Sequence, residues 1–196
     1  PGSVVTMIGS EGDTDPGPTL RGFTVTGGTL GTLIGTSTTL FGGGGVYTEW
    51  SHGRMESCRI VDNSANFGGG LYLWQSEVEL LDCEIVSNNA AADGGGLQFF
   101  RGANRATGCL FEGNDAIARG GGLHDVRSLG ELVDCTFVGN LADLGGGISV
   151  FAEAESLLTI SGCSITGNLV KVLGAGVWIR PGFDDVAFEN SVVCGN

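Results

Sequence analysis

The sequence is short of proline, of basic residues and of long apolar runs, and each shortage excludes a class of protein. Proline occurs only 4 times and glycine does not recur at every third position, so a collagen-like triple helix is excluded. No run of about 18 apolar residues occurs, so no membrane-spanning helix is predicted in this segment. The 9 Lys and Arg against 22 Asp and Glu give a net charge of −13, which disfavours nucleic acid and anionic membranes as partners.

Glycine is abundant, at 37 of 196 residues, and the hydrophobic fraction of 41% is enough to form a sizeable core. The apolar residues alternate with the period of two that is typical of strands, and helical spacing is absent over any useful length. One short segment also recurs along the chain, and its copies end at intervals of 25 to 28 residues. The copies are Cys58–Asn63, Cys83–Asn88, Cys109–Asn114, Cys135–Asn140, Cys163–Asn168 and Ser191–Asn196, after a degenerate copy at Phe23–Gly28.

A glycine cluster follows each repeated asparagine, as at Gly68–Gly70, and a short strand follows each cluster. A third, weaker apolar alternation precedes each cysteine. Three short strands in each repeat are typical of a parallel β-solenoid, and the preference for right-handed crossovers favours a right-handed parallel β-helix. We therefore predict an all-β fold in a single domain over residues 1–196. Residues 1–18 would form an irregular or capping segment, and 19–196 would form about seven coils that continue beyond this sequence.

The repeated asparagines are predicted to form a structural ladder. Stacked coils bring equivalent residues into one column, where the side-chain amides can bond to one another. Asparagine also tolerates the left-handed backbone conformation, which is expected of it at this turn. The ladder comprises Asn63, Asn88, Asn114, Asn140 and Asn168.

Two elements of these repeats resemble those of the passenger domains of chlamydial polymorphic membrane proteins, namely Phe-x-x-Asn and Gly-Gly-Ala followed by Ile, Leu or Val. Phe111–Asn114 and Phe137–Asn140 match the first, and Gly69–Leu71 and Gly95–Leu97 are similar to the second, with Gly in place of Ala. More broadly, residues 19–196 resemble the pectin-lyase-like superfamily of right-handed β-helices. The resemblance implies a bacterial cell-surface or extracellular protein, although proteins of this kind include both adhesins and polysaccharide lyases.

Five of the six cysteines occupy one position of the repeat and face inward by strand alternation. Equivalent Cβ atoms in stacked coils stay about 4.8 Å apart, which is too far for a disulfide, so we predict a column of buried free thiols. Zinc binding is the alternative, but it needs ligands that converge tetrahedrally, whereas this column is linear. Cys194 falls in another register and is expected to face outward, within reach of a partner outside this sequence. The column comprises Cys58, Cys83, Cys109, Cys135 and Cys163.

The strand after each glycine cluster is unusually aromatic on its outward side. Its first and third residues are expected to face inward, and its second and fourth residues outward. Three interpretations stay open: a surface for a protein or for self-association, a surface for carbohydrate, or a sheet face that only stabilises the fold or is covered by the insertion at Thr29–Leu40. The predicted surface comprises Tyr47, Tyr72, Trp74, Phe100, Phe151 and Trp178.

Candidates for catalysis are few. Asp125 interrupts the inward apolar pattern of its strand; a buried carboxylate needs a partner or a bulge, and a local bulge or an outward flip is expected here. Asp82 and Asp134 share one repeat position and are expected at a solvated rim. The two histidines, His52 and His124, fall in different coils. No catalytic residue, no metal site and no cofactor are therefore predicted.

These features predict a non-enzymatic cell-surface or extracellular scaffold or adhesin module. It would present its aromatic face or its ends to a protein, to a glycan or to a copy of itself. The alternative is a polysaccharide-binding or polysaccharide-degrading protein, for which a groove with converging carboxylates and basic residues is expected. Because the chain stops at Asn196, just after a strand, further coils, another subunit or a partner are expected at that end.

Overall fold

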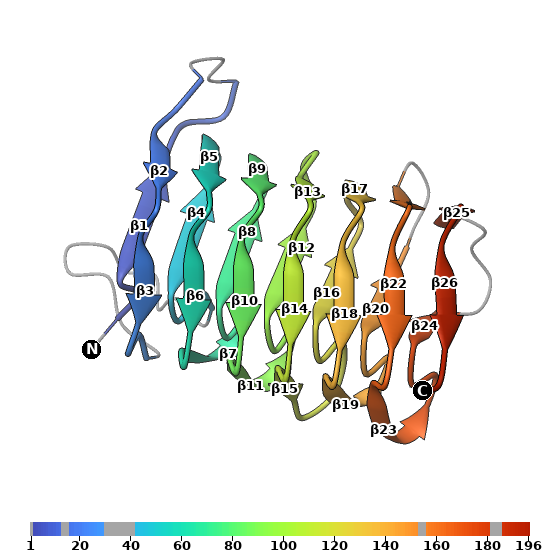
Figure 1. Cartoon of the computed structure of the whole chain (residues 1–196). Helices are drawn as coiled ribbons and strands as arrows, with labels where there is room; N and C mark the ends of the chain where they lie inside the picture. Colours follow the sequence, from blue (N-terminus) through green and yellow to red (C-terminus); the bar gives the residue numbers. More distant parts are fainter. Residues whose placement is uncertain (1, 13–15, 30–41, 153–155, 181–185) are drawn as a thin grey trace.

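Equivalent residues of successive repeats lie side by side in the computed structural model, which describes residues 2–12, 16–29, 42–152, 156–180 and 186–196. The chain winds into a rod of stacked coils, and the strands of each coil pair in parallel with those of the next (Figure 1). The described residues contain strands and no helix. The predicted all-β parallel solenoid is confirmed. The Thr29–Leu40 insertion lies, apart from Thr29, outside the described residues.

Three long sheets run along the rod, and we number the sheets in the order in which the chain meets them within a coil. The first sheet contains β1 (Val5–Ile8), β4 (Val46–Glu49), β8 (Leu71–Trp74), β12 (Leu97–Phe100), β16 (Leu123–Val126), β20 (Ile148–Phe151) and β24 (Val177–Ile179). The second contains β2 (Thr19–Arg21), β5 (His52–Glu56), β9 (Glu77–Leu81), β13 (Arg105–Thr107), β17 (Leu129–Val133), β21 (Leu157–Ser161) and β25 (Val186–Glu189). The third contains β3 (Thr24–Thr26), β6 (Arg59–Val61), β10 (Glu84–Val86), β14 (Leu110–Glu112), β18 (Thr136–Val138), β22 (Ser164–Thr166) and β26 (Val192–Cys194).

A fourth sheet, which the sequence pattern did not reveal, lies between the third sheet and the glycine cluster of each coil. In four of its five strands the inward position is held by a buried alanine, at Ala65, Ala90, Ala116 and Ala142. These small side chains leave no strong apolar alternation in the sequence, which is why the strand is hard to predict. The fourth sheet contains β7 (Ser64–Phe67), β11 (Asn89–Asp93), β15 (Asp115–Ala116), β19 (Leu141–Leu144) and β23 (Leu169–Leu173).

The core consists of columns in which each side chain packs on its equivalent in the next coil. In the column of the third sheet, the rings of Phe111 and Phe137 stack with centroids 4.4 Å apart and planes only 1° from parallel. Ile165 continues this column and is buried, whereas Val193 of the last coil is 47% exposed. Phe188, on an inward position of the second sheet, is likewise 44% exposed. The inward columns are therefore covered within the rod and uncovered at its last coil.

The asparagine column closes the turn between the third and fourth sheets. The Nδ2 of each asparagine donates to the Oδ1 of the asparagine in the next coil over 2.9–3.1 Å, and Asn196 extends the column by one residue. The prediction that these asparagines adopt the left-handed conformation is wrong. The residue before each of them does so, with φ of 55° at Asp62 and 54° at Ser87. That residue makes the turn, which leaves the asparagine side chain directed along the rod.

The five inward cysteines are free thiols and form one buried column, and Cys194 is exposed. Each Sγ in the column donates to the carbonyl two residues earlier over 3.3–3.4 Å. The hydrogen bond with the Cys135 thiol, together with burial, raises the pKa of Cys109 to about 12. The thiolate of Cys109 is therefore strongly disfavoured, and this thiol acts as packing rather than as a reactive group.

The glycine clusters are required by the close approach of successive coils. Gly94 has φ of 69°, and a Cβ on Gly95 would lie 2.5 Å from the carbonyl oxygens of Asp115 and Gly121. Neither position can hold a larger residue without displacing backbone. The tight turn that results places the residue before the glycine cluster, such as Phe67, Asp93 or Arg119, beside the outer face of the first sheet.

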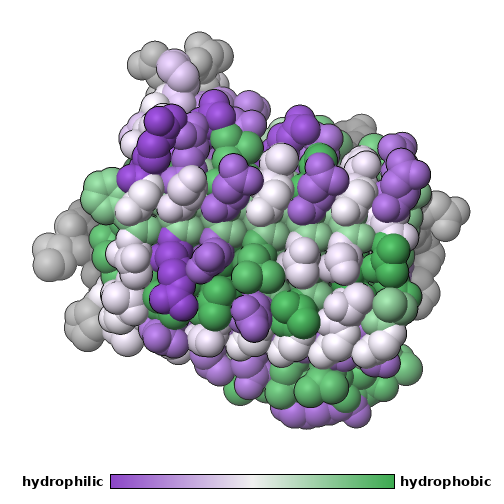
Figure 2. Space-filling view, in the orientation of Figure 1, coloured by the Kyte–Doolittle hydropathy of each residue, from purple (hydrophilic) through white to green (hydrophobic). Residues whose placement is uncertain are grey.

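The face over the third sheet mixes hydrophilic, intermediate and hydrophobic side chains, as Figure 2 shows. Hydrophobic side chains gather instead at the lower right of that view, over β19 and β23. In β23 the side chains of Leu169 and Leu173 are exposed. On the second sheet, basic and acidic residues alternate from coil to coil: Arg54 pairs with Glu79 at 3.5 Å, and Arg105 with Glu131 at 3.0 Å.

Candidate functional site

The outer face of the first sheet carries a groove with a volume of about 330 Å³. Its floor is made by the second residues of three consecutive strands, Tyr72 of β8, Gln98 of β12 and His124 of β16. One wall is made by the fourth residues of the first-sheet strands, which are Trp74, Phe100, Val126 and Phe151.

The opposite wall consists of residues that sequence reasoning missed. Phe67, Asp93 and Arg119 each precede a glycine cluster, and the turn brings them over the first sheet. The signal that could have found them is their shared position, one residue before each cluster, but their chemistry differs from coil to coil. Together the two walls turn a sheet face into a groove.

Only some of the predicted aromatic residues line the groove. Tyr72, Trp74, Phe100 and Phe151 line the groove, whereas Trp178 is part of β24, beyond the residues that line it. Tyr47 packs against Tyr72, with ring centroids 5.9 Å apart. The expectation that both tyrosines are exposed is wrong: Tyr47 is 3% and Tyr72 is 6% exposed. For Tyr72 the physical reason is Phe67, whose ring lies 6.4 Å from that of Tyr72.

Three buried side-chain oxygens on this face have no hydrogen-bond partner among the described residues: Asp93 Oδ1, Gln98 Oε1 and Ser149 Oγ. Asp93 is 8% and Gln98 is 4% exposed, and Ser149 is the floor residue next to His124 along the rod. A buried polar atom without a partner costs about 1–3 kcal/mol, so such atoms are rare. Two of these oxygens, Asp93 Oδ1 and Gln98 Oε1, belong to residues that line the groove, which indicates a place where a ligand supplies the missing partners.

The charged and titratable groups of the groove are partly buried. Arg119 Nη1 lies 3.5 Å from Asp93 Oδ2, and burial raises the pKa of Asp93 while the Arg119 charge opposes this. Burial, assisted by Arg119, lowers the pKa of His124 to about 3, so the imidazole is neutral at pH 7. His124 Nδ1 lies 3.3 Å from the carbonyl oxygen of Ser149, which can only accept. The proton is therefore on Nδ1, and Nε2 is an acceptor.

Asp125 lies directly beneath the groove floor and faces the core. The expected bulge or outward flip is wrong, because β16 pairs with both neighbours without a break in register and Asp125 is buried. Its Oδ1 accepts a hydrogen bond from Ser128, and burial raises its pKa to about 7 despite that bond. Ser128 belongs to a column of buried serines at the corner of the first and second sheets, which sequence reasoning also missed. The column comprises Ser51, Ser76, Ser128 and Ser156.

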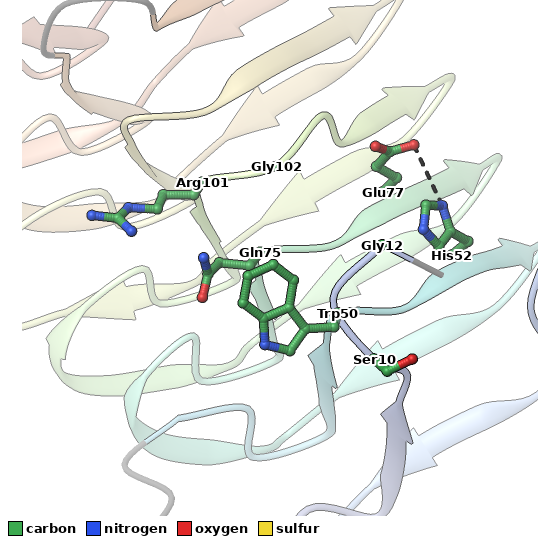
Figure 3. A pocket seen from close by; sticks show the side chains of 8 residues that line it. All are labelled: Ser10, Gly12, Trp50, His52, Gln75, Glu77, Arg101 and Gly102. Atoms are coloured by element: carbon green, nitrogen blue, oxygen red, sulfur yellow. Dashed lines mark ion pairs between the residues drawn. The ribbon is translucent and has the colours of Figure 1, made fainter. Parts of the chain in front are cut away.

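A second hollow, of about 530 Å³, lies at the corner between the first and second sheets (Figure 3). Trp50, Gln75 and Arg101 occupy equivalent positions there, and all three have left-handed φ values of 47–60°. His52 and Glu77 face each other across 3.4 Å, and the Arg101 side chain points away from them. Gln75 Oε1 accepts from Trp74 Nε1 at 2.6 Å. None of the residues that line this hollow has a buried polar atom without a partner, so the groove is the better candidate site.

Among the described residues, no group of three or more His, Cys, Asp or Glu side chains is arranged to hold a metal ion. The described segments also contain no helix with the length and apolar character needed to cross a membrane.

Comparison with known protein families identifies the fold. A family model described as the right-handed beta helix region matches residues 21–193. Comparison with curated proteins and with solved structures gave no match. The family match spans nearly all of the stacked coils described above, and the chain therefore belongs to the right-handed β-helix family.

Proposed function

We propose that this chain is a non-enzymatic binding module and that the groove on its first sheet holds a neutral glycan. The observation that carries the proposal is the combination of an aromatic wall with buried acceptors that have no partner, Asp93 Oδ1 and Gln98 Oε1. Sugar rings present C–H groups, which pack on aromatic rings, and hydroxyl groups, which donate to such acceptors. The Arg119 guanidinium supplies the complementary donors for sugar oxygens.

The charge of the protein supports a neutral rather than an acidic glycan. The net charge of −13 repels polyanions over the distances at which a ligand approaches. The groove itself contains both Asp93 and Arg119, which pair at 3.5 Å and leave no excess of positive charge between them.

The groove supports binding rather than hydrolysis. Glycoside hydrolysis uses two carboxyl groups on either side of the scissile bond. Asp93 is the one carboxylate among the described residues that line the groove, and its Oδ2 is already paired with Arg119. His124 is held neutral by burial and bonded to the backbone at Ser149.

The proposed setting is the bacterial cell surface or the extracellular space, where the module would act as an adhesin or scaffold. This part of the proposal rests on the resemblance of Phe111–Asn114 and Phe137–Asn140 to the repeats of chlamydial polymorphic membrane protein passenger domains. The wider resemblance to the pectin-lyase-like superfamily is consistent with a glycan as the ligand.

The experiment is a binding screen against neutral and acidic polysaccharides, followed by calorimetric titration of those that bind. Gln98→Leu removes an unpartnered acceptor and Phe100→Ala removes part of the aromatic wall, and each should weaken binding of a neutral polysaccharide at least tenfold. Asn89→Leu is the matched control, because this amide is exposed on β11 and lies outside the groove. Full binding by both groove variants, or no binding of any polysaccharide by the wild type, would overturn the proposal.

A further inference from the structure

The aromatic wall of the groove is a row of fourth-position side chains from consecutive coils, and one small residue interrupts it. Trp74 pairs in register with Phe100, Phe100 with Val126, and Val126 with Phe151. Val126 therefore leaves a gap between two phenylalanine rings that stand two coils apart.

Both rings turn a face along the rod. Phe100 stacks on Trp74 with centroids 4.6 Å apart and planes 22° from parallel, so Trp74 covers one of its faces. The guanidinium carbon of Arg180 lies 4.1 Å from the centroid of Phe151. Arg180 continues the row in the following coil, since its N–H donates to Val150 O, so it covers the face of Phe151 that points away from Val126. The remaining face of each phenylalanine is directed toward Val126.

The gap has the width of one ring. Adjacent coils are about 4.8 Å apart, so the two phenylalanines stand about 9.6 Å apart. A flat ring between them needs a contact distance of about 3.5–4.0 Å on each side, and the gap therefore admits one ring and no more. The Arg101 guanidinium lies 5.7 Å from the Phe100 centroid, but its side chain is exposed and can be displaced.

The polar groups of the groove are placed to hold the edge of such a ring. His124 lies in the same coil as Val126 and forms the floor at this point, with Nε2 as its acceptor. Gln98 is the floor residue of the preceding coil, and its Oε1 has no partner. Hydroxyl groups on the inserted edge of a sugar would donate to both.

We propose that Phe100, Val126 and Phe151 form a ring notch that takes a single sugar ring, inserted edge-on between the two phenylalanines. This inference rests on the proposed function and specifies its ligand. The plane of the inserted sugar ring is perpendicular to the long axis of the rod. The rings of Phe100 and Phe151 close the notch in both directions along that axis. The notch therefore selects a terminal or branching sugar and not the interior of a linear chain that runs along the groove.

The test fills the notch. Val126→Phe completes the aromatic row, and Val126→Met fills the gap with an unbranched side chain in case the larger ring disturbs folding. Val138→Phe is the matched control, since Val138 is an outward valine of β18 on the third sheet. The probes are the methyl glycosides of glucose, galactose and mannose and the linear hexamers of the same three sugars, titrated by calorimetry. Thermal unfolding followed by circular dichroism reports whether each variant is folded.

The expected result is a loss of at least tenfold in affinity for Val126→Phe and Val126→Met, with Val138→Phe unchanged. The methyl glycoside of the preferred sugar should bind within about threefold of its hexamer, because one ring makes most of the contacts. Equal binding by wild type and both Val126 variants, or a hexamer that binds more than tenfold better than its methyl glycoside, would overturn the ring notch and leave the glycan groove in place. No binding of any probe or of any polysaccharide in the screen would overturn the proposed function, and the notch with it.

Discussion

The asparagine column and the groove both bury polar side chains in register along the rod, but they differ in how completely those side chains are bonded. The Nδ2 of Asn114 donates to Ile85 O and Asn140 Oδ1, and its Oδ1 accepts from both nitrogens of Asn88. In the groove, Gln98 is equally well buried, yet its Oε1 has no partner.

The difference follows from repetition. Identical amides stacked one coil apart satisfy one another, because each is both donor and acceptor. The groove floor changes from Tyr72 to Gln98 to His124 to Ser149, and neighbours of different chemistry cannot complete each other's hydrogen bonds. The buried asparagine position that repeats serves the fold, and we infer that the varying polar positions of the groove floor are available to a ligand.

The largest expected effect comes from breaking the asparagine column at its centre. Asn114→Ala removes four hydrogen bonds and leaves buried groups of Asn88, Ile85 and Asn140 without that partner. At about 1 kcal/mol for each bond, the free energy of unfolding should fall by about 4 kcal/mol. Denaturant unfolding followed by fluorescence measures this loss.

The matched control is Asn89→Ala, which changes the next residue in the chain. Asn89 is exposed, so this substitution should change the free energy of unfolding by less than about 0.5 kcal/mol. Equal losses for the two variants would show that the column contributes nothing beyond ordinary turn propensity.

A smaller effect, and one that depends on pH, is expected beneath the groove. Burial raises the pKa of Asp125 to about 7, so folding favours its protonated form. The stability that this proton confers is complete below the unfolded pKa of about 4 and is lost as pH rises to about 7. Asp125→Asn does not titrate, so its stability relative to the wild type should increase by about 4 kcal/mol between pH 4 and pH 8. Parallel denaturant titrations at several pH values measure this difference.

Asp134→Asn serves as the control, because Asp134 is exposed at a corner of the rod. A stability difference for Asp125→Asn that stays constant over this pH range would mean that the Asp125 carboxyl titrates in the folded protein as it does in the unfolded chain, and the prediction would be wrong.

The period of the repeats was enough to predict the coils, the inward cysteine column and the asparagine ladder, because those positions keep the same residue. It was also enough to assign Trp74 and Phe100 to an outward face, because strand alternation is regular. The period could not predict that Tyr72 is buried, since this depends on Phe67, which belongs to a strand of another sheet.

The other wall of the groove could not be predicted from the repeats, because its residues differ from coil to coil. Phe67, Asp93 and Arg119 share a position, but an aromatic, an acidic and a basic residue present no repeated pattern. Asp125 was misplaced because a lone carboxylate in an apolar column suggests a bulge, and its partner Ser128 lies around a corner of the coil. The serine column was visible in the sequence at the spacing of the repeat, since Ser51, Ser76, Ser128 and Ser156 recur in register.

The smallest expected change in stability comes from Gln98→Leu, and it distinguishes the buried amide of the groove from those of the asparagine column. Gln98→Leu replaces a buried side chain whose Oε1 has no partner, so its removal should leave the protein as stable as the wild type or more stable by about 1 kcal/mol. The same substitution is expected to weaken glycan binding at least tenfold, so binding would fall while stability is kept or rises. Denaturant unfolding and calorimetric titration of one preparation give both values. A loss of stability as large as that of Asn114→Ala would show that Gln98 serves the fold. The inference that the varying polar positions of the groove floor are available to a ligand would then be wrong for Gln98.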